Sequence, residues 1–213
     1  MKQLHLGVDP IMNSDNPTKT VRLQVKAELV AACFTPLLTK GIRLVACLEC
    51  SLKELLCDQL GLAEDYLENR IQTVFLDGHP VDDVGRATVG EGATIALSAA
   101  MPGLVGAVLR KGGPLAALRK DITYSSDSTG HEVCDGSVTV KLFNMTTREI
   151  GPLLLKRGVW LKGTELREIF DRCADILSNG CRQAFYNDIP ISIASLMQRI
   201  KSEDGILLQV TVD

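Results

Sequence analysis

The chain has 213 residues, of which 46% are hydrophobic and only 4% aromatic, and its formal net charge is −3. This length allows one large domain or two small ones, each with a core built mainly from aliphatic side chains. The slight acidic balance argues against a dedicated nucleic-acid-binding protein, which would show a basic face. We therefore expect no nucleic-acid partner, although a local basic patch is compatible with this charge.

The chain shows no sign of export or membrane insertion. Residues 1–20 lack the long apolar core of a secretory signal and are predicted to form an N-terminal arm. The longest uncharged run, residues 93–109, is interrupted by Pro102 and is shorter than the roughly 20 residues that a membrane helix needs. The seven cysteines, an odd number, favour reduced thiols. We expect a cytoplasmic protein without membrane contact.

One short motif occurs twice, at residues 75–81 and 185–191. Each occurrence has an aromatic residue, a two-residue turn, a proline and a β-branched residue. Weaker matches keep the same order: residues 36–38 with 152–154, 41–44 with 158–161, 52–56 with 166–170, and 91–97 with 204–212. This order indicates two copies of one unit, at residues 21–100 and 138–213. Two unrelated α/β units with the same turn chemistry are the alternative.

Both copies are predicted to contain the same elements. Alternating apolar and polar residues predict the first strand of each copy, and Ser51 with Glu54 forms a capping box that predicts a helix start. Thr164 is the matching cap in the second copy. The predicted strands are residues 21–25, 42–48, 71–76 and 94–99, then 138–143, 159–161, 183–186 and 206–212. This order predicts an α+β protein with two tandem domains, each a mixed sheet packed on one helix.

Residues 101–137 belong to neither copy and are predicted to connect them. Pro114 is expected to open a short helix that ends at Leu118, and residues 124–136 have the composition of a linker. In residues 101–120, the basic residues Arg110, Lys111, Arg119 and Lys120 flank apolar residues, a composition that also occurs in segments that touch membranes. Glycines weaken any helix there, so we expect the segment to wrap the first copy or to pack between copies or between the subunits of a homodimer.

Four segments carry a resemblance to a known family: residues 74–83 and 90–97 in the first copy, and 142–151 and 163–166 in the second. Each copy resembles the ubiquitin-like β-grasp fold of the sulfur-carrier proteins, namely the small subunit of molybdopterin synthase and the thiamine sulfur carrier. The resemblance covers about three quarters of the chain. It implies two tandem β-grasp-like domains and, for a true carrier, an adenylating partner.

The sulfur carriers work through a free C-terminal Gly-Gly, and this chain departs from that pattern because it ends in Val-Thr-Val-Asp. Its single glycine pair, Gly112-Gly113, is internal and is followed by Pro114. The resemblance therefore implies a carrier tail only if the chain is cut after Gly113. A flexible hinge at this pair is the interpretation that we favour.

Cys47 and Cys50 form a Cys-x-x-Cys motif just before the capped helix, with Cys57 seven residues further on. Such a pair can serve as a redox centre or as half of a metal site. No second Cys-x-x-Cys occurs, and the three histidines show no zinc-ligand spacing. We favour core packing for these cysteines, with redox or metal binding as the alternative.

The sequence contains no catalytic motif. Gly-x-Ser-x-Gly and the phosphate-binding Gly-Lys-Ser/Thr pattern are absent, and Asp82-Asp83 is interpreted as the solvated exit of the first hairpin. We therefore expect a non-enzymatic protein without a cofactor. Its predicted role is protein interaction or scaffolding, because β-grasp modules commonly present a sheet face or edge to a protein partner.

Overall fold

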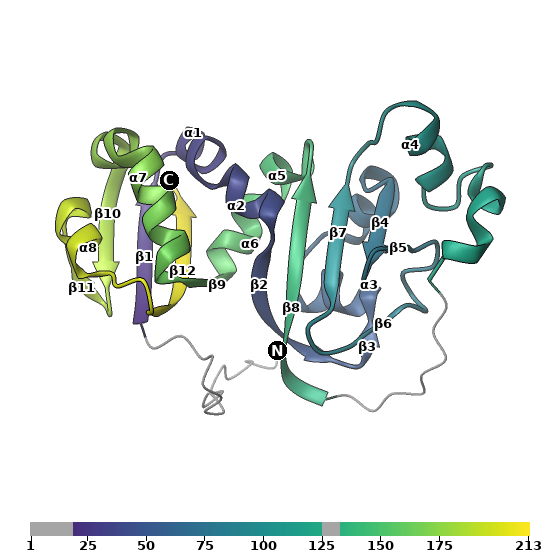
Figure 1. The fold of residues 1–213 in the computed structure, drawn as a ribbon, viewed down its shortest axis with the longest axis horizontal. Coiled ribbons are helices and arrows are strands. Elements are labelled where there is room, and N and C mark those ends of the chain that lie inside the picture. Colours follow the sequence, from purple (N-terminus) through teal and green to yellow (C-terminus); the bar gives the residue numbers. More distant parts are fainter. Residues whose placement is uncertain (1–18, 125–132) are drawn as a thin grey trace.

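The computed structural model describes residues 19–124 and 133–213, without the side chains of residues 120–122 and 133–135. It contains helices and one large mixed sheet, so the predicted α+β class is confirmed (Figure 1). The two separate sheets that the sequence predicted are instead joined in a single ten-stranded sheet.

Both halves of the chain follow the same order of strand, helices, strand, helix, hairpin and final strand. The first half contains β1 Lys19–Val25, α1 Ala27–Leu29, η1 Val30–Phe34, α2 Thr35–Lys40, β2 Ile42–Leu48, β3 Cys50–Ser51, α3 Leu52–Glu54, η2 Leu55–Gln59, η3 Tyr66–Arg70, β4 Thr73–Leu76, β5 His79–Pro80, β6 Thr88–Val89 and β7 Thr94–Ser98. The connecting segment contains α4 Gly103–Leu109 and η4 Ala116–Ile122. The second half contains β8 Val133–Phe143, α5 Thr146–Glu149, α6 Gly151–Arg157, β9 Val159–Lys162, α7 Gly163–Gly180, β10 Cys181–Tyr186, β11 Ile189–Pro190, α8 Ile193–Arg199 and β12 Gly205–Val212.

Several predicted boundaries differ from the structure. The predicted arm (residues 1–20) overlaps β1, which begins at Lys19, and its other residues lie outside the described part. The predicted linker overlaps β8, which begins at Val133, and residues 125–132 lie outside the described part. The predicted helix at residues 114–118 is a 3-10 helix that begins only at Ala116.

The first strand of each half pairs with strands of the other half. β1 lies between β10 and β12, antiparallel to β10 and parallel to β12. β8 lies between β2 and β7, antiparallel to β2 and parallel to β7. The cause is local: helices fill the connection between the first and second strands of each half, so these strands cannot form a short-turn hairpin.

The exchange divides the sheet into two lobes. The first lobe has the strand order β2-β8-β7-β4-β5, and the second has the order β9-β12-β1-β10-β11. They occupy the right and left sides of Figure 1. Between them, β2 and β9 pair only at Arg43 and Trp160, and Figure 1 shows the helices α2 and α6 in the region between the lobes.

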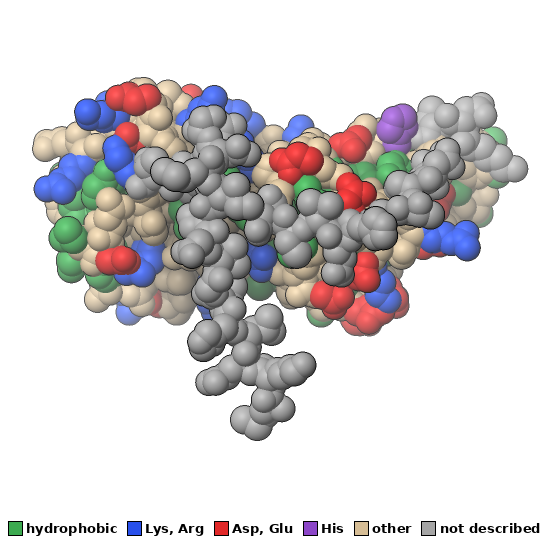
Figure 2. Space-filling view, turned by 90° about the horizontal axis from the view of Figure 1, so that it is seen from below, with side chains coloured by type: hydrophobic (Ala, Val, Ile, Leu, Met, Phe, Trp, Pro, Cys, Tyr) green, Lys and Arg blue, Asp and Glu red, His purple; other side chains and the backbone are tan. Residues whose placement is uncertain are grey.

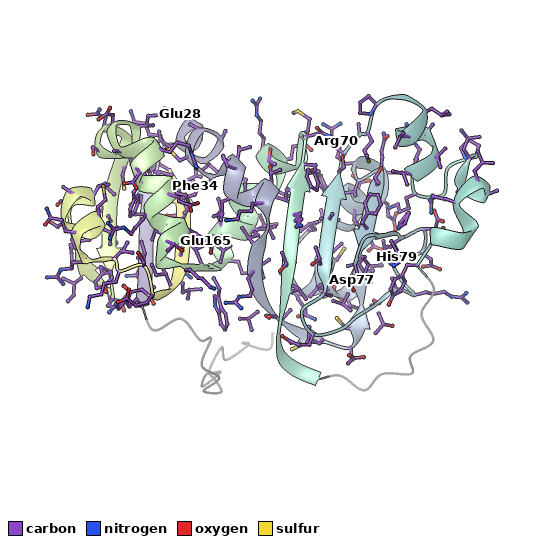
Figure 3. All side chains as sticks on the ribbon, in the orientation of Figure 1. Glu28, Phe34, Arg70, Asp77, His79 and Glu165 are labelled. Atoms are coloured by element: carbon purple, nitrogen blue, oxygen red, sulfur yellow. The ribbon has the colours of Figure 1, made fainter. Side chains whose placement is uncertain are left out.

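The repeated motif forms the same tight hairpin in both lobes. Its two turn residues have positive φ, 50° and 82° at Asp77 and Gly78, and 48° and 66° at Asn187 and Asp188. Two central residues with positive φ are the requirement of a type I′ turn, which glycine and short polar residues meet most easily. The prediction of a two-residue hairpin is therefore confirmed in both halves, and Figure 3 labels Asp77 in the first turn.

The predicted capping box at the start of α3 is confirmed. The backbone N–H of Ser51 donates to Glu54 at 2.8 Å, and the N–H of Glu54 donates to the Ser51 hydroxyl at 3.2 Å. The corresponding prediction for Thr164 is wrong, because α7 begins one residue earlier, at Gly163. The backbone N–H of Lys162 donates there to Glu165 at 2.9 Å.

One face of the sheet is buried under the helices across all the long strands. Cross-strand partners on this face are apolar throughout, for example Val21 with Leu208 and Ile42 with Val140. The opposite face, which we call the open face, carries Arg22, Gln209, Trp160, Arg43, Thr139 and Lys141 in neighbouring positions. All six of these side chains are exposed or half-buried.

Candidate functional site

Residues 101–124 fold back onto the first lobe. The backbone N–H of Lys111 donates to the carbonyl of Gln72 at 2.7 Å, and the N–H of Tyr124 donates to the carbonyl of Pro80 at 2.9 Å. The Tyr124 hydroxyl donates to the carbonyl of Thr88 at 3.0 Å. The segment is therefore fixed to the first lobe in its middle, at Lys111, and at its end, at Tyr124.

A buried arginine holds the middle of this segment. The Arg119 side chain is only 1% exposed, and its guanidinium donates to both carboxylate oxygens of Asp82, at 2.6 and 3.0 Å. It also donates to the carbonyls of Val108 and Arg110 and to the Thr123 hydroxyl, at 2.7, 3.2 and 2.9 Å. All five N–H donors of an arginine are thus used. The Arg119–Asp82 pair explains how a segment with little apolar burial stays in place.

The pair also determines the charge state of Asp82. Burial alone would raise the pKa of this carboxyl, but the hydrogen bonds from Arg119 and from the backbone of Gly112 outweigh burial, so the pKa lies below its usual value. Interpreting Asp82 as a solvated hairpin exit was wrong, because its carboxylate is the partner of a buried cation. The neighbouring Asp83 does lie at the surface and accepts from the N–H of Gly85 at 3.0 Å.

The same segment exposes large apolar side chains. Leu104 is 72% exposed, Val105 is 63% exposed and Leu118 is 72% exposed, and we call these three residues the apolar patch. α4 is held close to the preceding chain at Gly106, where an added Cβ would lie 1.8 Å from the carbonyl oxygen of Met101. A fixed segment thus presents its most apolar residues to solvent, which is typical of an interaction surface.

The glycine pair lies within this folded segment. The N–H of Gly112 donates to Asp82 at 2.8 Å, and the N–H of Gly113 donates to the carbonyl of Arg110 at 3.1 Å. Gly112 has a φ of +60°, which glycine adopts without strain. The structure therefore places Gly112 and Gly113 in a hydrogen-bonded turn that is anchored to Asp82.

Cys47 and Cys50 lie around the side chain of Gln59. The Gln59 amide accepts from the N–H of Cys47 at 2.8 Å, and it donates to the Cys47 carbonyl at 2.9 Å and to the Cys50 sulfur at 3.3 Å. Cys50 is buried, and its burial raises the pKa of its thiol. A raised pKa disfavours the thiolate that redox chemistry and metal binding need. Within residues 19–124 and 133–213, no three side chains of His, Cys, Asp or Glu are grouped to hold a metal ion.

A second thiol pair was not predicted from the sequence. Cys33 and Cys173 come from opposite halves of the chain, and both are buried. Burial, together with the neighbouring Cys173 thiol, raises the pKa of Cys33 to about 12. Sequence spacing gives no signal for such a pair, because 140 positions separate its members.

Glu149 in α5 joins the two halves at the surface. The Arg70 Nε donates to a Glu149 oxygen at 3.1 Å, and the Tyr66 hydroxyl donates to the same oxygen at 2.7 Å. These bonds lower the pKa of Glu149, while burial and the bond to Glu149 raise the pKa of Tyr66. Both donors bond to the same carboxylate, so the three groups tie the two halves together.

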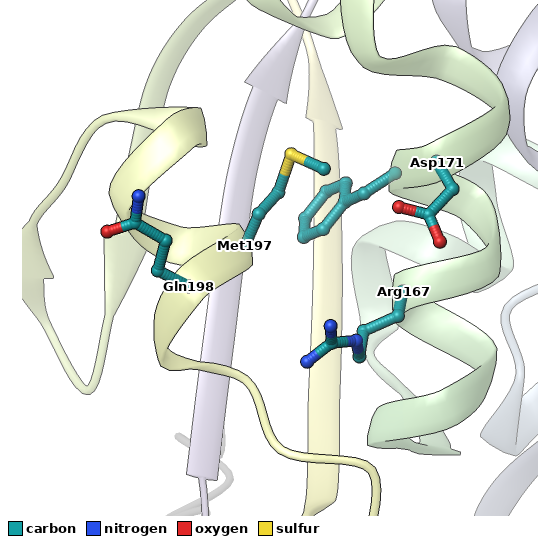
Figure 4. Close-up of a pocket in the computed structure, with 5 residues that line it drawn as sticks. Arg167, Asp171, Met197 and Gln198 are labelled. Atoms are coloured by element: carbon teal, nitrogen blue, oxygen red, sulfur yellow. The ribbon is translucent and has the colours of Figure 1, made fainter.

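A shallow groove separates α7 from α8 in the second lobe (Figure 4). Phe170 and Met197 form its apolar floor, and Arg167, Asp171 and Gln198 form its rim. Its volume is about 340 Å³. The Arg167 guanidinium donates to the carbonyl of Ile200 at 2.9 Å, which holds this side chain at the rim of the groove.

Across the described ranges, no helix combines the length and apolar character needed to span a bilayer. No protein-family model matches the sequence, and no curated protein or solved structure is significantly similar to it.

Proposed function

We propose that this protein is a non-enzymatic interaction module whose docking surface is the apolar patch on residues 101–124. The observation that carries the proposal is that an exposed apolar residue directly precedes a buried, fully bonded arginine. Leu118 is 72% exposed, while the next residue, Arg119, is buried and bonded through all five donors. The buried arginine fixes the apolar side chains in place before a partner arrives, which lowers the entropic cost of binding.

A second copy of the chain is the occupant that we propose. An apolar patch placed near a two-fold axis faces the same patch on its partner, so a single surface is sufficient to form a dimer. Each of the three large aliphatic side chains contributes about 1.5–3 kcal/mol to the free energy of association if it becomes fully buried. The proposed dimer forms through residues 101–120. We propose that this dimer, once formed, interacts with another protein.

The scaffold that presents this surface is proposed to be a pair of β-grasp-like domains, at residues 21–100 and 138–213. The support is the first lobe, in which a central parallel pair (β7 and β8) is flanked by β2 and by the β4–β5 hairpin. Because β8 comes from the second copy, the two units are proposed to exchange their first strands. A cytoplasmic location is part of the proposal. The six cysteines whose side chains are described are all free thiols, as expected in a reducing compartment.

The anchored turn at Gly112 and Gly113 fits an interaction surface better than a carrier tail, which must be free to enter another active site. Mass spectrometry of the protein isolated from its source checks this point. A chain that ends at Gly113 would favour a sulfur carrier over the proposed module.

Light scattering at increasing protein concentration tests the docking surface. The wild-type chain is expected to dimerise, and the double variant Leu104→Ser and Leu118→Ser is expected to remain monomeric with an unchanged melting temperature. Ile189→Ser is the matched control, since Ile189 is 62% exposed in β11 and lies outside the patch. If the wild-type chain stays monomeric when its concentration is raised 10-fold to 100-fold, the proposed dimer is wrong.

A further inference from the structure

The open face has a one-sided chemical composition. The described charged side chains on its strands are Arg22, Arg43, Lys141 and Lys162, all cations. They lie on four strands, β1, β2, β8 and β9, which come from both halves of the chain. Three carboxylates, those of Asp188, Asp213 and Glu91, reach this face from its borders. An excess of cations within the strands attracts polyanions.

Aromatic rings are interleaved with these cations. The Arg43 guanidinium lies 5.6 Å from the ring centre of Trp160, and the Arg22 guanidinium lies 5.2 Å from that of Phe185. Both rings are half-buried, and both belong to the open face. Three strand positions separate Phe185 from Trp160, which is about 14 Å at the usual spacing of strands.

Beside Phe185 the face is hollowed. The hollow has a volume of about 170 Å³, and its lining includes Phe185, Arg22, Lys156, Gln24, Gln209 and Thr211. It combines one aromatic ring, two cations, two amides and a hydroxyl. A stacked heterocycle with an attached phosphate needs this set of groups: a flat apolar partner, hydrogen-bonding edges and positive charge.

We propose that the open face binds single-stranded nucleic acid, with bases stacked on Phe185 and Trp160 and phosphates beside Arg22, Lys141 and Arg43. Rings on a sheet surface fit unpaired bases, because bases within a duplex are already stacked on one another. An acidic peptide would use the cations but would place no flat group against either ring. Asp188 borders the face and pairs with Arg22 at 2.8 Å, so a phosphate near the hollow must compete with this carboxylate.

The net charge of −3 does not oppose this proposal, because charge is unevenly distributed. Figure 2, which views the molecule from below, shows acidic side chains gathered over the right half, where the first lobe lies. The whole-chain average that argued against a nucleic-acid partner thus combines regions of opposite sign. The open face is independent of the apolar patch, so failure of one proposal leaves the other standing.

The chain contains one tryptophan, and Trp160 lies on the proposed surface, which gives a direct readout. Titration with dT20 and U20 oligonucleotides at 50 mM salt is expected to quench its fluorescence saturably. Fluorescein-labelled dT20 followed by anisotropy gives the dissociation constant. Trp160→Leu is expected to weaken binding about tenfold. The double variant Arg22→Gln and Lys141→Gln is expected to reduce the slope of log K against log salt by about 1.4.

Arg86→Gln is the matched charge control, because Arg86 is 89% exposed in the loop after the first hairpin. It is expected to leave the affinity unchanged, and the melting temperature of every variant shows whether the fold is retained. Three results would overturn the proposal: no quenching at 50 mM salt, equal affinity in Trp160→Leu, or equal competition by poly-glutamate. The last result would assign the face to acidic proteins.

Discussion

The two lobes contain the same elements but differ in which strand lies beside the hairpin. In the first lobe the turn residue Asp77 bonds to Thr94 at the start of β7, with distances of 2.7 and 2.8 Å. In the second lobe the equivalent Asn187 bonds in the same way to Thr20 in β1, at 2.8 and 2.9 Å. One turn chemistry thus accepts either a final strand or a first strand as its neighbour.

The hairpin therefore requires a neighbouring strand of a certain composition, but it does not determine which part of the chain supplies that strand. Both neighbours offer a threonine backbone at the start of a strand, followed by alternating apolar residues. In both halves, the helices after the first strand (β1 or β8) lead it away from its own second strand. The strand exchange is a property of the whole chain rather than of either lobe.

The most severe test of this comparison is to divide the chain. We expect that residues 1–128 and 129–213, produced separately, each remain unfolded, because each half lacks the strand that the other supplies to the centre of its sheet. Mixing the halves is expected to restore the folded signal, and circular dichroism with co-purification measures both outcomes. Two halves that fold independently would show that each first strand can pair within its own copy.

A smaller effect is expected from the feature that only the first lobe carries, the segment anchored by Arg119. Arg119→Ala leaves Asp82 without its cation and is expected to lower the free energy of unfolding by about 3 kcal/mol. Hydrogen exchange at the amides of Lys111 and Tyr124 should accelerate, while β10 and β12 stay protected. Arg110→Ala is the control, since Arg110 is exposed and its side chain donates a single bond, to Gln72.

The same pair predicts a pH dependence. Because the pKa of Asp82 is lowered in the folded state, its contribution to stability is present above the unfolded pKa of about 3.9 and is lost as the pH falls through the folded value. Urea unfolding between pH 6 and pH 2.5 is expected to show this loss in the wild type. Arg119→Ala should flatten that part of the profile, and an unchanged profile would mean that other carboxylates dominate it.

The smallest effects concern the turns themselves. Gly78 and Asp188 occupy the same turn position, with φ of 82° and 66°. Asp188→Gly is expected to stabilise the protein by about 0.5 kcal/mol, and Gly78→Ala to destabilise it by about 1 kcal/mol. Denaturant midpoints measure both. If Asp188→Gly destabilises the protein instead, the exposed ion pair of Asp188 with Arg22 outweighs the backbone preference.

Local features were predictable from the sequence because their causes are local. β2 was predicted with its observed bounds, and the Ser51 capping box and both turns are set by residues at most three positions apart. Strand partners were not predictable, because alternation at residues 21–25 identifies the buried face but says nothing about the strand beside it. The Arg119–Asp82 pair was missed for the same reason, since 37 positions separate its members.

The strand exchange also delays the pairing of β1 during protein synthesis. Lys19 in β1 bonds to Asp204, which is 185 residues later in the chain. At about 5–20 residues per second, β1 leaves the ribosome about 10–40 s before that partner exists. Its apolar residues Val21, Leu23 and Val25 lack their native partner strands, β10 and β12, throughout this interval. For most of the protein's synthesis, β1 is therefore an unpaired strand whose edges are prone to aggregation.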